Sequence, residues 1–417
     1  MNMDQIKAFL KKSMDQIKTF LTKNKEQLYQ VLSYVLVAVA TASVTVAITV
    51  GVMNSSNPRS KISVLEQLIA ERYVGQLDPV LVGDAAAEAM IEALGDRWSY
   101  YISAEEYAAY QENKKNVYVG IGITIEKDKQ TGAFRITRLT EGGSAAEAGL
   151  CLDDQVVAVD GQSVLGMDLQ ALRDLVQGEV GTEVTVTVLR AEMQQSIIVT
   201  RKYIRTPVAK ATLLDGNVGV IRIRNFNDHC YEETRACMDQ LLEQGAQMLI
   251  FDVRFNLGGY ADEMVKVLDD LLPEGQLLRT VSYNGKESVD YSDAGFTDLP
   301  MAVLVNSNSH SAAEFFAAAM QEYKAAGKLE KKLVIVGEQT SGKGYYQNTF
   351  LLPDGSAVAL SVGKYYTPEG KNLEGKGLLP DQVVPVDKQT ADKIYAGMLA
   401  PEDDVQLQAA INALKQP

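Results

Sequence analysis

Histidine and cysteine are scarce in this chain, which has 2 histidines and 3 cysteines among 417 residues. The cysteines, Cys151, Cys230 and Cys237, are odd in number and irregularly spaced, so they form neither a disulfide framework nor a zinc-site pattern. We interpret all three as small apolar residues that pack inside the protein. With so few histidines, a serine paired with a lysine is the simpler hydrolytic arrangement for this composition.

Positive charge is also in short supply. The 40 lysines and arginines are outnumbered by 54 aspartates and glutamates, which gives a net charge of −14. An acidic chain of this kind argues against nucleic acid as a partner. Residues 1–30 depart from the trend, because six lysines face only Asp4, Asp15 and Glu26. The hydrophobic fraction of 46% is typical of a globular protein, and the length has room for two or three domains.

An uncharged run covers residues 31–53, which is long enough to cross a bilayer. A buried core helix and a cleaved signal peptide are the alternatives. Lysines precede the run and a polar loop follows it, so the sequence predicts an uncleaved transmembrane anchor. The N-terminus would then be cytoplasmic, and everything after Met53 would be extracytoplasmic, in a single-pass protein of the cell membrane.

A short repeat occupies the N-terminal segment, where MDQIKAFLK at residues 3–11 recurs as MDQIKTFLT at residues 14–22. Eleven residues is close to three helical turns, so the apolar residues share one face. The repeat predicts a basic amphipathic helix within residues 1–30 that lies on the cytoplasmic leaflet. A solvated extension is the alternative.

The spacing of apolar and polar residues changes several times after the predicted anchor. Residues 60–115 have helical spacing, and Ser103 with Glu106 is typical of a capping box. Residues 117–203 read as a compact β-rich module, in which residues 182–190 look like an edge strand.

Strands and helices alternate over residues 205–400, and a helical tail follows at 401–417. The rhythm predicts an α/β domain with a mixed, largely parallel sheet. Functional residues of such a domain lie where strands end. The predicted strands are Val218–Ile223, Met248–Val253, Ala302–Val305 and Leu333–Val336, and the predicted helices are Glu232–Gln244, Asp262–Leu272 and Ala312–Ala325.

Two polar segments follow two of these strands. Ser311 lies in NSNSHSAAE and opens a helix, where free N–H groups can hold an oxyanion. Lys343 lies between two glycines in GEQTSGKGYYQ, and burial can make such a lysine a usable base. The alternatives are that Ser311 is only a helix N-cap and that Lys343 is a solvated lysine in a loop.

The chain resembles the C-terminal processing peptidases, a family of tail-specific serine proteases with an inserted PDZ domain. The resemblance runs from about Ile62 to Val384, and its segments occur in family order. They include DVRFNLGG at 252–259, YYTPEG at 365–370 and GKGLLPD at 375–381. The resemblance implies an α/β protease core with an inserted PDZ domain, and it implies no metal and no cofactor.

Matching the motifs residue by residue assigns roles to single positions. The resemblance implies that Ser311 is the nucleophile, Lys343 the base and Gln347 the residue that orients the lysine. It implies an oxyanion hole from the backbone N–H groups of Ala312 and of Gly258 or Gly259. The carboxylate-binding loop of the PDZ domain would be formed by Gly120, Ile121, Gly122 and Ile123.

Some positions depart from the family pattern. His310 replaces an alanine before the nucleophile, Ala313 replaces a serine, and Leu257 stands where proline is preferred. His310 could serve as a second base, but neighbours in sequence rarely face each other at a helix start, so we expect it to affect access or the pH profile. Ser309 is the alternative nucleophile.

The sequence thus predicts a membrane-anchored serine endopeptidase that cleaves near the C-terminal tails of protein substrates held by its PDZ domain. A catalytically silent PDZ scaffold and a peptide-binding adaptor are the alternatives. The resemblance also implies a homodimer that forms through the helices between Ile62 and Tyr101.

Overall fold

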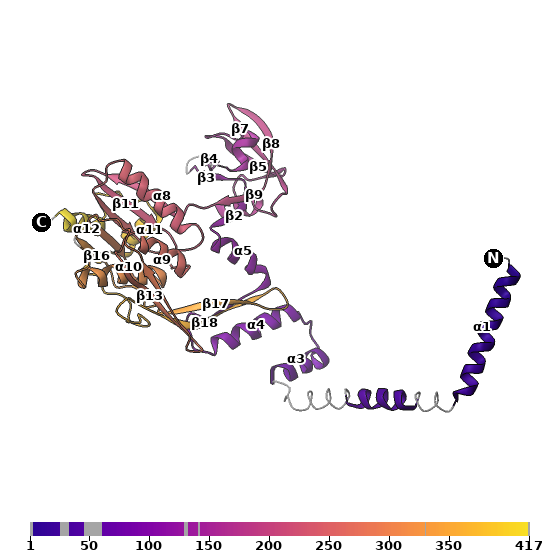
Figure 1. The fold of residues 1–417 in the computed structure, drawn as a ribbon. Helices are drawn as coiled ribbons and strands as arrows, with labels where there is room; N and C mark the ends of the chain where they lie inside the picture. The colour runs from indigo at the N-terminus through magenta and orange to yellow at the C-terminus, as the bar shows by residue number, and fades with distance from the viewer. Residues whose placement is uncertain are drawn as a thin grey trace. The chain divides into compact units, whose positions relative to one another are not determined.

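The computed structural model describes residues 3–25, 33–45, 61–128, 132–140, 142–329 and 331–415 (Figure 1). The chain divides into two compact units, residues 1–83 and 84–417. The first unit contains α1 (Met3–Lys23), a helical stretch at residues 33–45, α3 (Lys61–Arg72) and the first turn of α4 (Pro79–Glu92). The second unit contains everything else.

The transmembrane helix predicted for residues 31–53 was wrong. Across the described residues, no helix is both long and apolar enough to cross a membrane. Of the predicted span, residues 33–45 are helical and the others lie outside the described residues. The cellular location inferred from that anchor stays a prediction.

A six-stranded sheet forms the centre of the second unit, in the order β10-β11-β12-β15-β16-β19. Only β10 and β11 are antiparallel, and the other neighbours are parallel. The predicted α/β domain with a largely parallel sheet is therefore confirmed. The strands are β10 (Ala209–Leu214), β11 (Val218–Ile223), β12 (Met248–Asp252), β15 (Met301–Val305), β16 (Leu333–Gly337) and β19 (Gln382–Val383).

Helices cover both faces of this sheet. Leu249 and Phe251 of β12 belong to a core that includes residues of α8 (Cys230–Glu243), α9 (Ala261–Asp269) and α10 (Ala312–Ala325). Ile250, which points to the opposite face, packs in a second core with α12 (Val405–Lys415). Burial on both faces explains why these strands are continuous apolar runs in the sequence.

A five-stranded antiparallel sheet accompanies the central one, and no pattern in the sequence predicted it. Its order is β1-β18-β13-β14, and β17 also pairs with β18. It carries the segment that follows Lys343, because Tyr345 begins β17. The strands are β1 (Tyr100–Ile102), β13 (Gly275–Ser282), β14 (Glu287–Ser292), β17 (Tyr345–Leu351) and β18 (Ala357–Tyr366), and α11 (Lys388–Ala396) follows.

The β-rich module has its own hydrophobic core, formed by buried residues between Ile121 and Val199. Its main sheet has the order β3-β4-β5-β7-β8, with β6 beside β5, while β2 pairs with β9. The elements are β2 (Val117–Gly120), β3 (Ile123–Lys127), β4 (Phe134–Leu139), α6 (Ser144–Ala148), β5 (Gln155–Val159), β6 (Gln162–Ser163), α7 (Leu169–Val176), β7 (Glu183–Arg190), β8 (Met193–Thr200) and β9 (Lys202–Arg205).

The edges of this sheet differ from the prediction. The strand at residues 183–190, β7, is an interior strand that pairs with β5 and β8, and its Val184, Val186 and Val188 are buried. The edge strands are β8, which pairs only with β7, and β3, which pairs only with β4 among the strands of its sheet. One side of β3 therefore has its backbone groups available for another strand.

The junction between the module and the protease core is held by polar contacts. Helix α5 (Ala104–Lys114) leads into β2 and begins with the predicted capping box of Ser103 and Glu106. Just after it, the side-chain amides of Asn116 and Asn225 bond each other reciprocally, at 3.1 and 2.8 Å. The next residue after Asn225, Phe226, donates its N–H to the carbonyl of Gly258 at 2.8 Å.

The three cysteines do not all pack inside the protein as predicted. Cys230 is buried, and burial raises the pKa of its thiol to about 12. Cys237 is partly buried, but Cys151 is exposed. It follows Leu150 at the tight turn after α6, where its N–H donates to Asp154.

Candidate active site

Ser311 lies at the turn between β15 and α10, after the end of a strand of the central sheet. Its side chain is buried and its backbone has φ 51° and ψ −119°, a strained conformation for a residue with a side chain. Such a conformation costs about 1–3 kcal/mol and is kept only where the surrounding structure enforces it. A strained serine between a strand and a helix start has the backbone geometry of a nucleophile elbow.

Glu314 is the group that enforces this turn. Its buried carboxylate accepts the N–H of Ser311 at 2.9 Å. The same carboxylate accepts two hydroxyls and two N–H groups from the loop that carries Lys343. These four donors are the hydroxyls of Thr340 (2.5 Å) and Ser341 (3.2 Å) and the N–H groups of Gly342 (2.8 Å) and Lys343 (2.8 Å). One carboxylate therefore fixes the backbone of Ser311 and the backbone of Lys343 to each other.

Lys343 is partly buried, in the loop between β16 and β17. Its pKa is lowered to about 8, first by burial and second by the positive charge of Lys114, against the opposing effects of Asp96, Glu314 and Glu374. Lys114 lies at the end of α5. An amine with this pKa is substantially neutral near pH 8 and can accept a proton.

Trp98 lies against the amine of Lys343, whose Nζ is 5.1 Å from the centre of the indole ring. The guanidinium of Arg97 also lies over this ring, at 4.1 Å, and the ring of His310 meets it edge-on, with ring centres 6.0 Å apart. The indole N–H donates to Glu374 at 3.0 Å, and Glu374 accepts the N–H of Gly344 as well. Trp98 is thus fixed beside the lysine by contacts on its ring and its nitrogen.

A cleft of about 610 Å³ brings Ser311, Lys343 and Gln347 together. Gly259 and Lys114 also line it. The remaining lining is rich in aromatic side chains: Tyr100, Tyr107, Tyr110, Tyr260, Tyr346, Phe350 and Tyr365. The predicted nucleophile, base and glutamine therefore share one cleft, although the serine comes from a different segment of the chain than the lysine and the glutamine.

The oxyanion-hole prediction can be refined, because the two glycines differ. The N–H of Gly258 donates to the side chain of Asn256 at 2.9 Å. In the described part of the chain, the N–H groups of Gly259 and Ala312 have no acceptor. A Cβ on Gly258 would lie 2.9 Å from Cβ of Ser311, and one on Gly259 would lie 2.3 Å from the backbone of Phe226. The glycines thus allow the turn to approach the serine, and Gly259 rather than Gly258 has the N–H to offer.

In the described residues, the side chain of Gln347 makes its hydrogen bonds to groups other than Lys343. Its side-chain amide donates to the carbonyl of Tyr345 at 3.3 Å and to the hydroxyl of Ser361 at 3.1 Å. Among the described residues, neither bond involves Lys343. Gln347 lines the cleft, and its role in orienting the lysine stays a prediction.

Ser309 and His310, which precede the predicted nucleophile, differ in their surroundings. Ser309 is fully buried; its hydroxyl donates to the carbonyl of Val253 at 2.8 Å and accepts the N–H of Asn306 at 3.1 Å. This engagement leaves Ser309 unsuited to be the nucleophile. His310 has a buried Nδ1 without a hydrogen-bond partner among the described residues, and its ring packs on Trp98.

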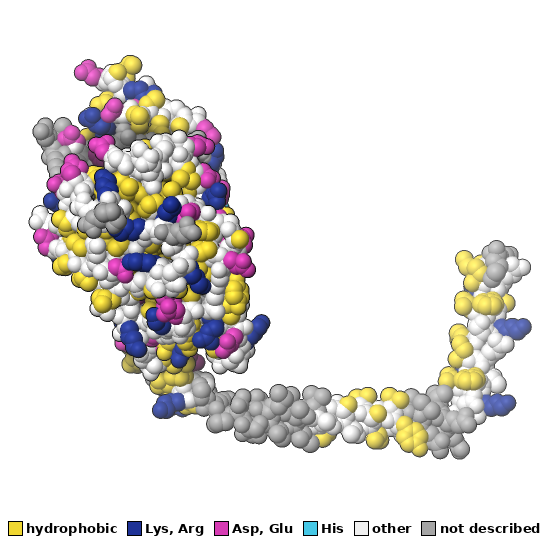
Figure 2. All heavy atoms as spheres, turned by 60° about the vertical axis from the view of Figure 1, so that its left-hand side comes forward, with side chains coloured by type: hydrophobic (Ala, Val, Ile, Leu, Met, Phe, Trp, Pro, Cys, Tyr) yellow, Lys and Arg dark blue, Asp and Glu magenta, His cyan; other side chains and the backbone are white. Residues whose placement is uncertain are grey.

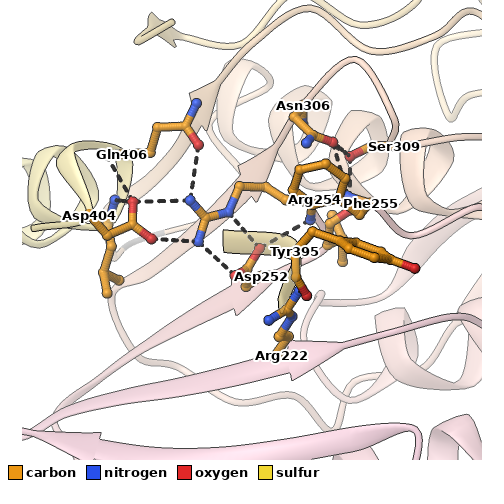
Figure 3. A network of polar contacts seen from close by, with 11 residues as sticks. Arg222, Asp252, Arg254, Phe255, Asn306, Ser309, Tyr395, Asp404 and Gln406 are labelled. Atoms are coloured by element: carbon orange, nitrogen blue, oxygen red, sulfur yellow. Dashed lines mark hydrogen bonds and ion pairs between the residues drawn. The ribbon is translucent and has the colours of Figure 1, made fainter. Parts of the chain in front are cut away.

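A second network supports the turn that carries the glycines (Figure 3). Arg254 is buried and uses all of its side-chain nitrogens, with two bonds to Asp252 and three to the start of α12. The bonds to α12 go to Asp404 (3.0 and 2.8 Å) and Gln406 (2.9 Å), and those to Asp252 are both 2.8 Å. The next residue, Phe255, donates its N–H to Asn306 at 3.0 Å, which ties the end of β12 to the end of β15.

The predicted carboxylate-binding loop connects β2 to β3 in the β-rich module. Gly120 ends β2 and Ile123 begins β3. The carbonyls of Ile121 and Gly122 accept N–H groups from Ala145 and Thr140. In the described part of the chain, the N–H groups of Ile121 and Gly122 have no acceptor. The loop thus lies at one end of the edge strand β3, with two N–H groups to offer an anion.

Sequence reasoning missed several residues of the site. The sequence analysis assigned no role to Glu314, although the spacing Ser311-x-x-Glu314 is a capping-box signal. Trp98 and Lys114 had no local signal, because Trp98 reaches Lys343 from the segment before α5 and Lys114 lines the cleft from the last turn of α5.

Comparison with known proteins gives consistent results. The sequence model of peptidase family S41 matches residues 217–384, and that of a PDZ domain matches residues 135–190. The chain is 33% identical to a "Carboxyl-terminal-processing protease" of Synechocystis sp., over 79% of this chain and 76% of the relative. It is 31% identical to the "Carboxy-terminal processing protease CtpA" of Bacillus subtilis, over 82% and 74%. It is 30% identical to a "Probable CtpA-like serine protease" of Staphylococcus haemolyticus, over 84% and 74%.

Proposed function

The chain belongs to peptidase family S41 and is a serine-type peptidase of the carboxyl-terminal-processing kind, and on this premise we propose that Ser311 is its nucleophile and Lys343 its base. The main support for the proposal is that one cleft is lined by both residues: Ser311, which has a strained backbone, and Lys343, whose pKa is lowered to about 8. Glu314 supports it, because this carboxylate binds the backbone of both residues.

The proposed mechanism is acyl transfer. The neutral amine of Lys343 takes the proton of the Ser311 hydroxyl, and the oxygen attacks the scissile carbonyl. The N–H groups of Gly259 and Ala312 stabilise the oxyanion, each contributing about 3–4 kcal/mol. The lysine then protonates the leaving amine, and water hydrolyses the acyl-enzyme.

The proposed substrates are proteins with exposed C-terminal tails. The N–H groups of Ile121 and Gly122 would hold the terminal carboxylate, and the tail would add as a strand beside β3. The edge position of β3 supports this. The aromatic rings that line the cleft would pack against the substrate chain near the scissile bond.

The test compares the full-length wild type with Ser311→Ala and Lys343→Ala. Each is incubated with an unstructured protein that has an apolar tail, and the products are read by intact mass. We expect tail residues to be lost with the wild type alone. Cleavage by Ser311→Ala would overturn the nucleophile assignment. A wild type that binds the tail but never shortens it would favour the silent scaffold or adaptor.

The pKa of Lys343 predicts how the rate depends on pH. The reactive form is the neutral amine, so kcat/KM should rise with pH around a midpoint near 8. Lys114 lowers the pKa of Lys343 by its positive charge. Lys114→Gln should therefore raise the pKa of Lys343 and move the midpoint to higher pH. The variant and the wild type should have equal kcat/KM only well above both midpoints.

The matched control is Lys115→Gln, because Lys115 is exposed, adjoins Lys114 and is absent from the cleft lining. Its pH profile should coincide with that of the wild type. A midpoint that stays unchanged in Lys114→Gln would contradict the charge effect.

We also propose that a second copy of the chain covers helices α3 and α4. Neither helix has a buried residue, and Val64, Leu65 and Leu68 of α3 are exposed. Light scattering of the full chain at micromolar concentration should give the mass of a dimer. A monomer mass for both the full chain and its Leu65→Gln variant would contradict this.

A further inference from the structure

Helix α1 presents its large apolar side chains to solvent. Each of them is exposed, and the exposed fractions of Phe9 and Phe20 exceed 60%. The set is Met3, Ile6, Phe9, Leu10, Met14, Ile17, Phe20 and Leu21. Eight exposed apolar side chains in 21 residues are more than a soluble helix usually leaves uncovered.

These side chains form one stripe. At about 100° per residue, they fall within a sector of roughly 140° around the helix axis. The eleven-residue repeat advances the pattern by only about 20°, so the second copy continues the stripe of the first. Figure 2 shows hydrophobic side chains in a row along one side of α1 and lysines projecting away from them.

The lysines border the stripe. On the helical wheel, Lys7 and Lys18 adjoin one edge, and Lys12 and Lys23 lie beyond the other. Asp15 lies near the middle of the polar face. Residues 3–25 contain six lysines and two aspartates, while the whole chain has a net charge of −14. Positive charge is thus concentrated on a helix that also exposes an apolar stripe.

This arrangement fits the interface of an anionic membrane better than a protein groove. Apolar side chains can enter the boundary between headgroups and acyl chains, while the flanking lysines extend to the phosphates. An eleven-residue repeat is compatible with a right-handed coiled coil, but the apolar stripe, at roughly 140°, is wider than the narrow seam of a coiled coil.

We propose that α1 is a binding site for the surface of a membrane that contains anionic phospholipids. The helix lies in the plane of the surface and does not span the bilayer. Its partner chemistry is an acyl boundary for the stripe and phosphate groups for the lysines. The site holds the peptidase beside a membrane whether or not Ser311 and Lys343 have the proposed roles.

The first test measures sedimentation of the full chain with vesicles of phosphatidylcholine, with and without 30% phosphatidylglycerol (an arbitrary choice of about one anionic lipid in three). We expect the anionic lipid to increase binding, and 0.5 M salt (roughly a 4 Å screening length) to cancel the increase. Lys12→Gln with Lys23→Gln should reduce the partition coefficient for anionic vesicles about 30-fold. Lys210→Gln with Lys388→Gln removes the same charge from exposed sites on β10 and α11 and should have little effect. Equal binding by the two double variants would overturn the proposal.

The second test locates the contact on the helix. A polarity-sensitive fluorophore is attached at Phe20→Cys or at Ala8→Cys, each in a Cys151→Ser background that removes the exposed native thiol. With anionic vesicles, we expect a blue shift at position 20 and none at position 8. A blue shift at position 20 before vesicles are added would show that protein covers the stripe. Shifts at both positions, or at neither, would also contradict a helix lying in the interface.

Discussion

Replacing Glu314 by glutamine is expected to reduce kcat/KM for tail cleavage by about 100-fold or more, because small displacements of reacting groups have effects of that size. All five partners of the carboxylate are donors: the N–H groups of Ser311, Gly342 and Lys343 and the hydroxyls of Thr340 and Ser341. The amide nitrogen of glutamine cannot accept, so at least two donors lose their acceptor in either orientation. The free energy of unfolding should fall by about 2–5 kcal/mol.

The same substitution has a signature that a merely structural residue would not give. The negative charge of Glu314 raises the pKa of Lys343. Its removal should lower that pKa, so the midpoint of the pH–rate profile should move below that of the wild type even as the rate falls. The profile is measured as kcat/KM between about pH 6 and pH 10, the range that contains the lysine titration.

Glu322 supplies the matched control. It is a buried carboxylate on the same helix and accepts the hydroxyl of Thr367 at 2.9 Å and the N–H of Glu369 at 2.8 Å. Glu322→Gln should cost comparable stability while the pH midpoint stays in place, since Glu322 is not among the charges that act on Lys343. If Glu314→Gln and Glu322→Gln gave the same kinetics, Glu314 would have no special role at the site.

Replacing Arg254 by leucine should give the largest loss of stability, about 3–5 kcal/mol at pH 7. The reason is that two buried carboxylates, Asp252 and Asp404, would lose the cation between them (Figure 3). The loss is measured by urea unfolding of the full chain. Arg235→Leu is the control, because Arg235 is about half exposed and its ion pairs with Asp239 and Asp270 should contribute less than about 1 kcal/mol.

The effect of Arg254→Leu should depend on pH in a stated direction. In the wild type, burial would raise the pKa of Asp252, but the charge and hydrogen bonds of Arg254 outweigh it and lower this pKa. The resulting stability is present above about pH 4 and is lost as the pH falls through the lowered pKa. In the variant, the charge of Arg222 and the N–H of residue 254 still lower the pKa of Asp252, but the guanidinium that opposed burial is gone, so protonation relieves the cost as the pH falls from 7 toward 5. The difference between the two proteins should therefore shrink over that interval, and a constant difference would contradict the assignment.

The central sheet was predictable because its strands are buried on both faces. Continuous apolar runs such as residues 301–305 and 333–337 have few other readings, and the polar segments after them identified Ser311 and Lys343. The second sheet was not predictable in this way. Its β17 is mostly exposed on the outer side, and β1 pairs with β18 through residues as distant as Tyr100 and Ala359.

The parts of the site that the sequence did not reveal depend on contacts between distant segments. Arg97 donates to the carbonyl of Gly342 across 245 residues, and neither position has a local pattern that points to the other. The choice between Gly258 and Gly259 was open for a different reason. Only the structure shows that the side chain of Asn256 occupies the N–H of Gly258.

Trp98 is the only tryptophan in the chain, and this makes the protein its own optical probe. Indole emission depends on nearby charge and on water, and this indole contacts the amine of Lys343, the ring of His310 and the carboxylate of Glu374. The indole emission of the folded chain therefore originates at the candidate active site. Arrival of a peptide, or loss of the lysine proton, can be followed in unlabelled protein in real time, before any bond is cut.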